Sequence, residues 1–277
     1  MIGFCTDSNA QLPEKLVERF GAEVVPLTIT IDGQDFLEGV DLDADAFYER
    51  FADGAQPQVS TAAPSPGQFA AAYDTLAARG ATEILSVHLG SAISGTFNSA
   101  RLAVDASPVP VRLVDTGTAS FAIACCLWEA AEAAVAGASL EEAAAVAESV
   151  AATTDNVFIT GALELVRAGG RLAASVGDAA GSVPVLSLVD GAIQPIATAA
   201  TVDEAVAAMA AHVRRVGTRL RVGISVADAA AAPLWHALED ALTGAPEVLE
   251  IVRYRISPSV GVHTGPGAAG AVSYPAR

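Results

Sequence analysis

The sequence predicts an α/β protein of two domains, residues 1–156 and residues 157–277. In the first, short apolar runs alternate with helical segments, which is typical of a doubly wound parallel sheet. In the second, an Asp190-Gly191 pair separates two apolar runs, which predicts a β-hairpin. We therefore expect the second domain to be α+β with a mainly antiparallel sheet. At 277 residues and 52% hydrophobic residues, the chain can bury two such cores.

Four runs of the first domain are apolar at both odd and even positions, as strands covered on both faces of a parallel sheet are. They are Ile2–Thr6, Val24–Ile31, Ile84–Leu89 and Val111–Val114. Three capping boxes predict helix starts, because each pairs Ser or Thr with Glu or Gln three residues later. They begin at Ser65, Ser139 and Thr201, and the first has proline at the first helical position.

Five runs of the second domain are strand-like. They are Val157–Thr160, Val183–Val189, Ala192–Ile196, Arg221–Val226 and Val248–Ile256. The last alternates apolar and polar residues, which suggests an antiparallel strand with one face in water.

Charge and hydropathy exclude several classes of partner. The formal net charge is −17 and Lys15 is the only lysine, so neither nucleic acid nor an anionic membrane surface is expected as a partner. The apolar run Ile256–Ala276 is long enough to span a bilayer but contains three prolines, so we expect no transmembrane segment.

The sequence also lacks several motifs that would indicate secretion, disulfides, a metal or a cofactor. No charged and then apolar leader opens the sequence, so we expect no signal peptide and a cytoplasmic location. The three cysteines lack CxxC spacing, which indicates buried thiols in a reducing compartment. No metal-ligand spacing, dinucleotide fingerprint or P-loop is present, so we expect no metal and no cofactor.

A small polar loop, Ser94-Gly95-Thr96, follows the strand run Ile84–Leu89 and precedes a helix predicted from Phe97. Backbone N–H groups at a helix N-terminus, with nearby hydroxyls, form a site for an anion. An ordinary helix cap explains the same residues equally well. Thr61, just before the helix that Ser65 caps, could offer a hydroxyl to the same site, or could simply lie in a turn.

Three further segments are candidates. The segment Gly261–Gly267 is predicted as a rigid loop that lets His263 approach a ligand. Gly169-Gly170-Arg171 could bind, or could be a helix C-cap followed by a surface charge. Asp7 could act in catalysis, although fixing a loop is the commoner role of an aspartate there. Among the other histidines, His88 is expected in the core and His212 and His236 on the surface.

Five of these pieces occur in the same order in one family, and the sequence resembles the DegV family of bacterial lipid-binding proteins over essentially its whole length. The matching residues are Thr6-Asp7-Ser8, Thr61-Ala-Ala-Pro64-Ser65, Ser94-Gly95-Thr96, Gly169-Gly170-Arg171 and His263-Thr264-Gly265-Pro266-Gly267. The resemblance implies the two-domain EDD fold, with a fatty acid in a tunnel between the domains.

The resemblance also implies a function without catalysis by this chain. Members are binding subunits of a fatty acid kinase and present the acyl carboxylate to a separate subunit that makes acyl phosphate. Residue by residue, it places Thr61, Ser94, Gly95, His263 and Thr264 around the carboxylate, with Thr96 beside them and Arg171 near the mouth or the kinase.

Three positions depart from the family pattern. Ala62 replaces a common Ser, Gly90-Ser91 replaces a pair of serines, and Ala200 stands where members often carry Arg. The last departure weakens the expectation of kinase docking more than that of lipid binding. Two alternatives remain: a lipid hydrolase using Ser94, His263 and an aspartate such as Asp7 or Asp115, and an enzyme that binds a phosphate ester.

Overall fold

The computed structural model describes residues 1–168, 170 and 182–276. The chain divides into two compact units. Unit 1 comprises Met1–Leu42 and Gln58–Ala152, and unit 2 comprises Asp43–Pro57 and Thr153–Arg277. This division therefore falls after residue 152 rather than after the expected residue 156, and it assigns a segment from the expected first domain to unit 2.

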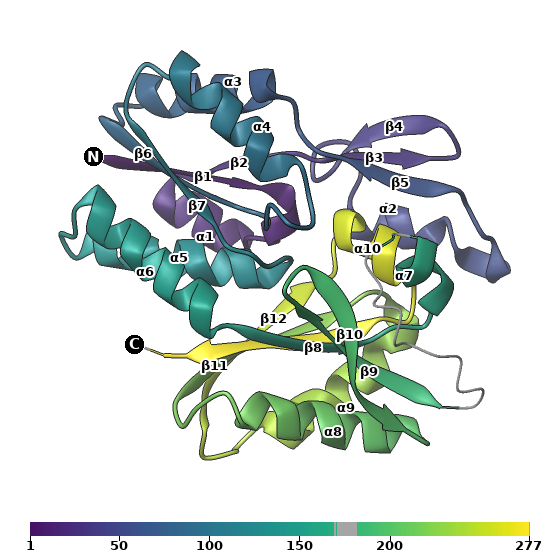
Figure 1. The fold of residues 1–277 in the computed structure, drawn as a ribbon. Coiled ribbons are helices and arrows are strands. Elements are labelled where there is room, and N and C mark those ends of the chain that lie inside the picture. Colours follow the sequence, from purple (N-terminus) through teal and green to yellow (C-terminus); the bar gives the residue numbers. More distant parts are fainter. Residues whose placement is uncertain (169, 171–181, 277) are drawn as a thin grey trace. The chain divides into compact units, whose positions relative to one another are not determined.

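Unit 1 contains a parallel sheet of four strands in the order β2-β1-β6-β7. The strands are β1 (Ile2–Asp7), β2 (Glu23–Val25), β6 (Glu83–His88) and β7 (Val111–Asp115). Helices α3 (Pro66–Ala78) and α4 (Thr96–Ala103) cover one face, and α1 (Glu14–Phe20), α5 (Phe121–Val135) and α6 (Leu140–Thr153) lie on the other side (Figure 1). The predicted doubly wound arrangement is confirmed.

The first two turns of helix α5 are apolar on every side and form much of the core of unit 1. Phe121, Ile123, Cys126 and Leu127 are each at most 1% exposed. A helix that is hydrophobic all round is expected only where protein surrounds it. The apolar run that this helix contains therefore belongs to a core.

A second, antiparallel sheet in unit 1 has the order β4-β3-β5, formed by β3 (Thr28–Ile31), β4 (Gln34–Leu37) and β5 (Val59–Ala62). The prediction of one strand over Val24–Ile31 is wrong, because Pro26 lies between β2 and β3, which belong to different sheets. Proline lacks the N–H that a continuous strand would need. Asp32 and Gly33 connect β3 to β4 with φ of 49° and 81°, which is a hairpin signal that the sequence analysis missed.

Unit 2 contains a six-stranded sheet in the order β10-β9-β8-β13-β11-β12. The strands are β8 (Asp155–Ile159), β9 (Val183–Val189), β10 (Ala192–Ala199), β11 (Leu220–Val226), β12 (Val248–Arg255) and β13 (Ala269–Pro275). Asp190 and Gly191 join β9 to β10 with φ of 49° and 77°, which confirms the predicted hairpin. The sheet is mainly antiparallel, as predicted.

The strand predicted over Val248–Ile256 is present as β12, but its predicted antiparallel direction is wrong. It pairs parallel to β11 at the edge of the sheet, after the crossover helix α9 (Ala232–Leu242). Its alternating pattern therefore reflects the partial exposure of an edge strand and carries no information about direction.

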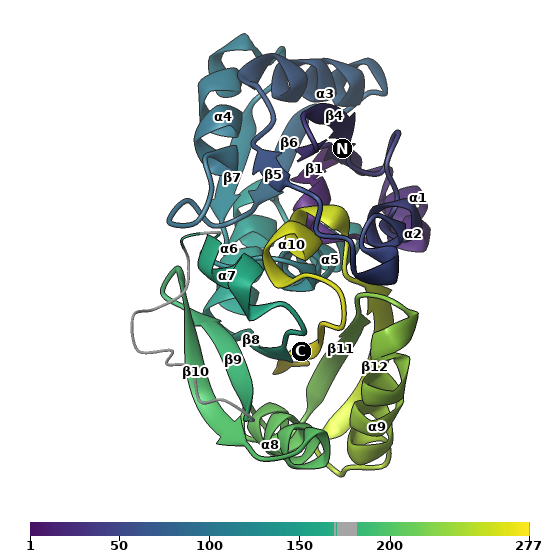
Figure 2. The same cartoon turned by 90° about the vertical axis from the view of Figure 1, so that its right-hand side faces the viewer.

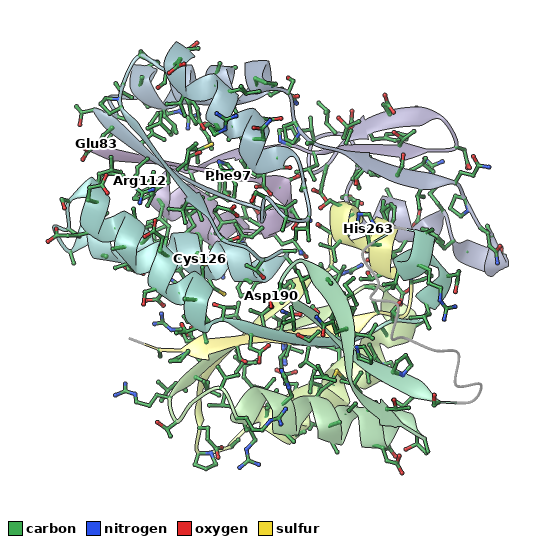
Figure 3. All side chains as sticks on the ribbon, viewed as in Figure 1. Glu83, Phe97, Arg112, Cys126, Asp190 and His263 are labelled. Atoms are coloured by element: carbon green, nitrogen blue, oxygen red, sulfur yellow. The ribbon has the colours of Figure 1, made fainter. Side chains whose placement is uncertain are left out.

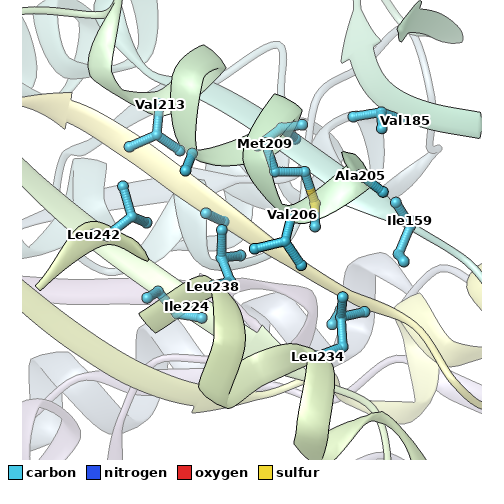
Figure 4. Packing of buried hydrophobic residues seen from close by; sticks show 14 of the residues in the cluster. Ile159, Val185, Ala205, Val206, Met209, Val213, Ile224, Leu234, Leu238 and Leu242 are labelled. Atoms are coloured by element: carbon cyan, nitrogen blue, oxygen red, sulfur yellow. The ribbon is translucent and has the colours of Figure 1, made fainter. Parts of the chain in front are cut away.

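Helices α8 (Val202–Arg214) and α9 cover one face of this sheet (Figure 2). Met209 on α8, Leu238 on α9 and Ile224 on β11 are fully buried in the core between them (Figure 4). Three shorter helices, α2 (Ala44–Glu49), α7 (Leu163–Ala168) and α10 (Pro258–Thr264), complete the unit, and α10 packs on the other two. The described residues also form 3-10 turns at Ser8–Ala10, Ala52–Gly54, Val104–Ala106 and Ala229–Ala231.

Two of the three predicted capping boxes form in full. The Gln68 amide donates to Ser65 Oγ, and the Glu142 amide donates to Ser139 Oγ, with the reciprocal bonds present in both. At the third, the Glu204 amide donates to Thr201 Oγ1, but the Glu204 carboxylate accepts from the Ala200 amide. All three helices therefore begin where the sequence predicted.

Candidate ligand-binding site

The order of strands in unit 1 points to one edge of its parallel sheet. From β1 the chain moves outward to β2, and later returns to β6 on the other side of β1 before continuing to β7. Such a reversal leaves a crevice at the carboxyl ends of the two central strands, where open α/β sheets bind ligands. Asp7 ends β1 and His88 ends β6, so the segments that follow these two residues start at this edge of the sheet.

The loop after β6, residues Gly90–Gly95, leads into α4, which begins at Thr96 rather than at the predicted Phe97. Ser94 Oγ lies 2.9 Å from Thr96 Oγ1 and accepts the Thr96 amide at 3.3 Å. Thr96 is fully buried, Ser94 is half-buried and Gly95 is exposed. The loop therefore presents hydroxyls and a helix N-terminus together, as an anion site requires.

Thr61 lies on β5, opposite Ile29, and is half-buried. A Cβ placed on Gly95 would lie 3.8 Å from Ala63 Cβ, so the segment after Thr61 passes beside the start of α4. Within unit 1 the structure thus brings the segments of Thr61 and of Ser94 to one place. Glycine at 95 leaves the backbone open there.

Beneath this loop lies a fully buried chain of polar groups. Asp7 Oδ2 lies 3.0 Å from His88 Nδ1 and also accepts the Leu89 amide at 3.0 Å. His88 Nε2 lies 2.5 Å from Ser86 Oγ, which lies 3.1 Å from the hydroxyl of Tyr73. Asp7, His88, Ser86 and Tyr73 are all 0% exposed. His88 is therefore a bonded core residue, as predicted, and Asp7 fixes a loop.

This chain of groups has the order of a Ser-His-Asp triad, but burial gives it a different role. Ser86 lies within β6, and no substrate can approach a serine that is 0% exposed. Asp7 is engaged by His88, so the hydrolase alternative loses one of its two candidate aspartates. The same burial raises the pKa of the nearby Cys5 thiol to about 12 and raises the pKa of Tyr73.

The second candidate aspartate is also occupied by backbone. Asp115, at the end of β7, accepts the Ser91 amide at 3.0 Å and the Gly117 amide at 3.1 Å. Gly90 approaches the next loop so closely that a Cβ there would lie 2.7 Å from the Gly117 carbonyl carbon. The loop after β6 is therefore held by an aspartate on either side of Gly90.

In unit 2, the predicted loop Gly261–Gly267 is wrong in its first half. Residues Pro258–Thr264 form helix α10, and His263 and Thr264 are its last two residues (Figure 3). His263 is half-buried, and the buried Thr264 donates its hydroxyl to the Val260 carbonyl at 3.2 Å. The motif thus places the imidazole in the last turn of α10.

Three glycines permit the close packing around α10. A Cβ on Gly261 would lie 2.6 Å from Phe47 Cε1, on α2. Gly265 has φ of 69°, and a Cβ there would lie 2.3 Å from Ala162 Cβ. A Cβ on Gly161 would lie 2.6 Å from the Pro266 carbonyl oxygen. The glycines of this motif therefore serve packing against its own unit.

Sequence reasoning missed Asp228, which also fixes this segment. One carboxylate oxygen accepts the Gly267 amide at 3.0 Å, and the other accepts the Ala231 amide at 3.0 Å as a helix cap. Thr160 Oγ1, at the end of β8, donates to the Thr264 carbonyl. The signal for Asp228 was present, because an aspartate shortly after a strand and before an alanine-rich run is a typical N-cap.

Some predicted residues fall elsewhere. Arg171 and Gly169 lie outside the described residues, while Gly170 has φ of 68° and donates its amide to the Arg167 carbonyl, as a residue after a helix end does. His212 was predicted at the surface, and this is wrong, because His212 is half-buried and its Nε2 lies 2.9 Å from Asp155 Oδ2. His236 is exposed, as predicted.

The described residues contain no group of His, Cys, Asp or Glu that could hold a metal ion. In the same part of the chain, no helix is both long and apolar enough to cross a membrane.

Comparison with known proteins decides the family. The family model described as "Uncharacterised protein, DegV family" matches residues 1–276. A DegV domain-containing protein of Streptomyces coelicolor is 34% identical over 275 residues, covering 98% of this chain and 97% of that protein. The chain belongs to the DegV family.

Solved structures of DegV proteins share the fold of this chain. A DegV family protein from Thermus thermophilus, described by its fatty acid binding, matches with 30% identity, a TM-score of 0.89 and 99% of both chains. DegV from Bacillus subtilis, described as a fatty acid binding protein, matches with 25% identity, a TM-score of 0.88 and 99% of both chains.

Proposed function

We propose that this chain binds a long-chain fatty acid. The observation that carries the proposal is the match over 99% of the chain to the Thermus thermophilus DegV structure described by its fatty acid binding. The candidate segments agree with it in chemistry, because they offer hydroxyls, a helix N-terminus and an imidazole, which are donors suited to a carboxylate.

The proposal assigns the carboxylate to Thr61, Ser94, Gly95, His263 and Thr264, with Thr96 fixing the hydroxyl of Ser94. It thus assigns the donors to segments of both units. A net charge of −17 repels a fatty acid anion at long range, so local donors have to offset that field. Each charge-assisted hydrogen bond contributes about 1.5–3 kcal/mol, and the acyl chain adds about 0.8 kcal/mol per buried CH₂.

The proposal extends to the role of the complex. This chain performs no catalysis and presents the acyl carboxylate to a separate kinase subunit in the cytoplasm, and the proposal gives Arg171 to ligand presentation or kinase docking. In unit 1, Ser94 Oγ accepts the Thr96 amide and contacts the Thr96 hydroxyl, which supports binding over nucleophilic attack.

Native mass spectrometry of the purified protein tests the proposal. We expect a mass increment of one fatty acid, identified after extraction. Protein that is free of lipid and cannot be loaded with palmitate or oleate would refute it. A recovered phosphate ester would favour the phosphate-binding alternative, and a fluorophosphonate adduct lost in Ser94→Ala would favour the hydrolase.

Two histidines of unit 2 give a matched pair of variants. His263→Ala should weaken fatty acid retention about tenfold or more, the worth of one charge-assisted hydrogen bond. His236→Ala removes an exposed imidazole from α9 and should leave retention unchanged. Equal retention in both variants would remove His263 from the site.

A further inference from the structure

We propose that Asp7 is a positioning residue for the ligand loop Gly90–Thr96, with His88 orienting its carboxylate. This inference rests on the proposed function, because that function gives the loop to the ligand carboxylate. Asp7 touches no ligand in this proposal. It acts through the backbone at the point where β6 ends and the loop begins.

The geometry of Asp7 carries the inference. Its Oδ2 accepts the Leu89 amide at 3.0 Å, and Leu89 directly precedes the loop. This bond joins the carboxyl ends of β1 and β6, the two central strands between which the order of the sheet reverses. A carboxylate that is 0% exposed makes a stronger hydrogen bond to an amide than one in water, so it fixes that amide firmly.

His88 determines which way the carboxylate points. Its Nδ1 lies 3.0 Å from the same Oδ2, and its Nε2 is held by Ser86, which contacts Tyr73. The ring also packs edge-on against Phe69, with centroids 5.0 Å apart. Ser86 and Phe69 thus hold the His88 ring, and of these buried side chains His88 is the one that contacts Oδ2. Asp7 Oδ1 is buried and has no hydrogen-bond partner among the described residues, so the carboxylate is oriented toward Leu89 and His88 alone.

Other bonds also hold the loop near its start. The Gly90 amide donates to the Thr118 carbonyl at 2.9 Å, and the Ser91 amide donates to Asp115, which is exposed. The amide and hydroxyl of buried Thr116 both donate to the His88 carbonyl, which precedes Leu89. Asp7 is therefore a buried anchor that bonds the Leu89 amide itself, and Asp115 is a solvent-exposed one. Losing the buried anchor should free residues 89–96 while leaving the sheet intact.

The variant Asp7→Ala tests this, with Tyr73→Phe as the control. Tyr73→Phe removes the far end of the same buried network and destabilises unit 1 without touching the Leu89 amide. Hydrogen exchange of intact protein followed by mass spectrometry measures each peptide. We expect the amide hydrogens of residues 89–96 to exchange about tenfold faster in Asp7→Ala than in wild type. In Tyr73→Phe, exchange in that peptide should be unchanged.

Fatty acid affinity is the second measurement. We expect Asp7→Ala to bind palmitate about tenfold more weakly, and Tyr73→Phe to bind within about twofold of wild type. If Asp7→Ala does not fold, Asp7→Asn replaces it. Asn retains an uncharged oxygen for the Leu89 amide, so both effects should have the same direction and be smaller.

The outcomes separate this inference from the proposed function. Unchanged exchange of residues 89–96 in the Asp7 variant, or equal acceleration in Tyr73→Phe, overturns the inference. Faster exchange with unchanged affinity also overturns it, because the loop would then move without affecting the ligand. Wild-type protein that binds no fatty acid refutes the proposed function, and the exchange pattern still decides whether Asp7 anchors the loop.

Discussion

Unit 1 holds its candidate segment with two carboxylates and one close approach, at Gly90, whereas unit 2 holds its own with three close approaches and one carboxylate, Asp228. Around Gly90, Asp7 and Asp115 accept the amides of Leu89 and Ser91. Around α10, Gly261 and Gly265 allow backbone to approach within distances that a side chain would block. A hydrogen bond can weaken gradually when its acceptor changes, whereas a close approach tolerates no added atom. The two units should therefore differ sharply in how substitutions affect them.

The largest effect is expected for Gly265→Ala. Its φ is 69° and a Cβ would lie 2.3 Å from Ala162 Cβ, so backbone strain and overpacking add. We expect a loss of about 3–5 kcal/mol in the free energy of unfolding. Urea unfolding followed by Trp235 fluorescence in a Trp128→Phe background would report on unit 2.

Gly267→Ala is the control for Gly265→Ala. It also has a positive φ, of 74°, but a Cβ there meets no atom closer than 3.5 Å. It should lose only about 1–2 kcal/mol. Equal losses in both variants would show that backbone strain alone matters and that the close approach does not.

Gly261→Ala should rank next. Gly261 is helical, so no backbone strain is involved, but a Cβ would lie 2.6 Å from Phe47 Cε1 and 2.7 Å from the Tyr48 hydroxyl. We expect a loss of about 1–3 kcal/mol from overpacking, measured by the same unfolding experiment. Gly67→Ala in α3 is the counterpart in unit 1, where the nearest atom is 3.8 Å away. That variant should be neutral or more stable, and a loss there equal to that of Gly261→Ala would contradict the contrast.

A smaller effect is expected from the charge pair of unit 2. Burial opposes ionisation of Asp155, but the hydrogen bond and charge of His212 outweigh it and lower the pKa of Asp155. A lowered pKa stabilises the fold above the unfolded pKa of an aspartate, and this contribution is lost as the pH falls through the folded value. The urea midpoint of wild type should therefore fall more steeply in acid than that of Asp155→Asn. Parallel curves would show that the pair contributes nothing.

The least change is expected when native protein is treated with a thiol reagent, because its cysteines should hardly react. Burial raises the pKa of Cys5 and of Cys126 to about 12, so almost no thiolate is present at mildly alkaline pH. Native protein should take up iodoacetamide only through opening of unit 1, about a thousandfold more slowly than a free cysteine. Intact mass should show three labels in concentrated guanidinium. Rapid native labelling would mean that the core around α5 opens readily.

Much of the fold was predictable because local patterns and tertiary structure agree. Capping boxes at Ser65 and Ser139, and the Asp190-Gly191 hairpin, are set by neighbours in sequence. The direction of β12 was not predictable, because pairing direction depends on a partner strand distant in sequence. The split of Val24–Ile31 was signalled by Pro26, and the missed hairpin by Asp32-Gly33.

The candidate site was predictable as residue types but not as geometry. Ser94 and Thr96 follow a strand and precede a helix, as the sequence indicated. His263 was expected in a loop and lies in a helix. Glycine at position 261 disfavours a helix locally, but the close packing of Gly261 on Phe47 stabilises one. The link from Asp7 to Leu89 spans 82 positions, so no local pattern could reveal it.

The segment Asp43–Pro57 has a consequence for how the chain is synthesised and dissected. It lies between β4 and β5 of unit 1 in sequence, yet its helix α2 packs on α10, more than 200 positions later. During synthesis on the ribosome, the Phe47 ring lacks its contact with α10 until that helix has been made. Until then it is an exposed hydrophobic site that chaperones can bind. A fragment that begins at residue 153 lacks this helix, so α10 and its His263 would lose one of the surfaces that shape them.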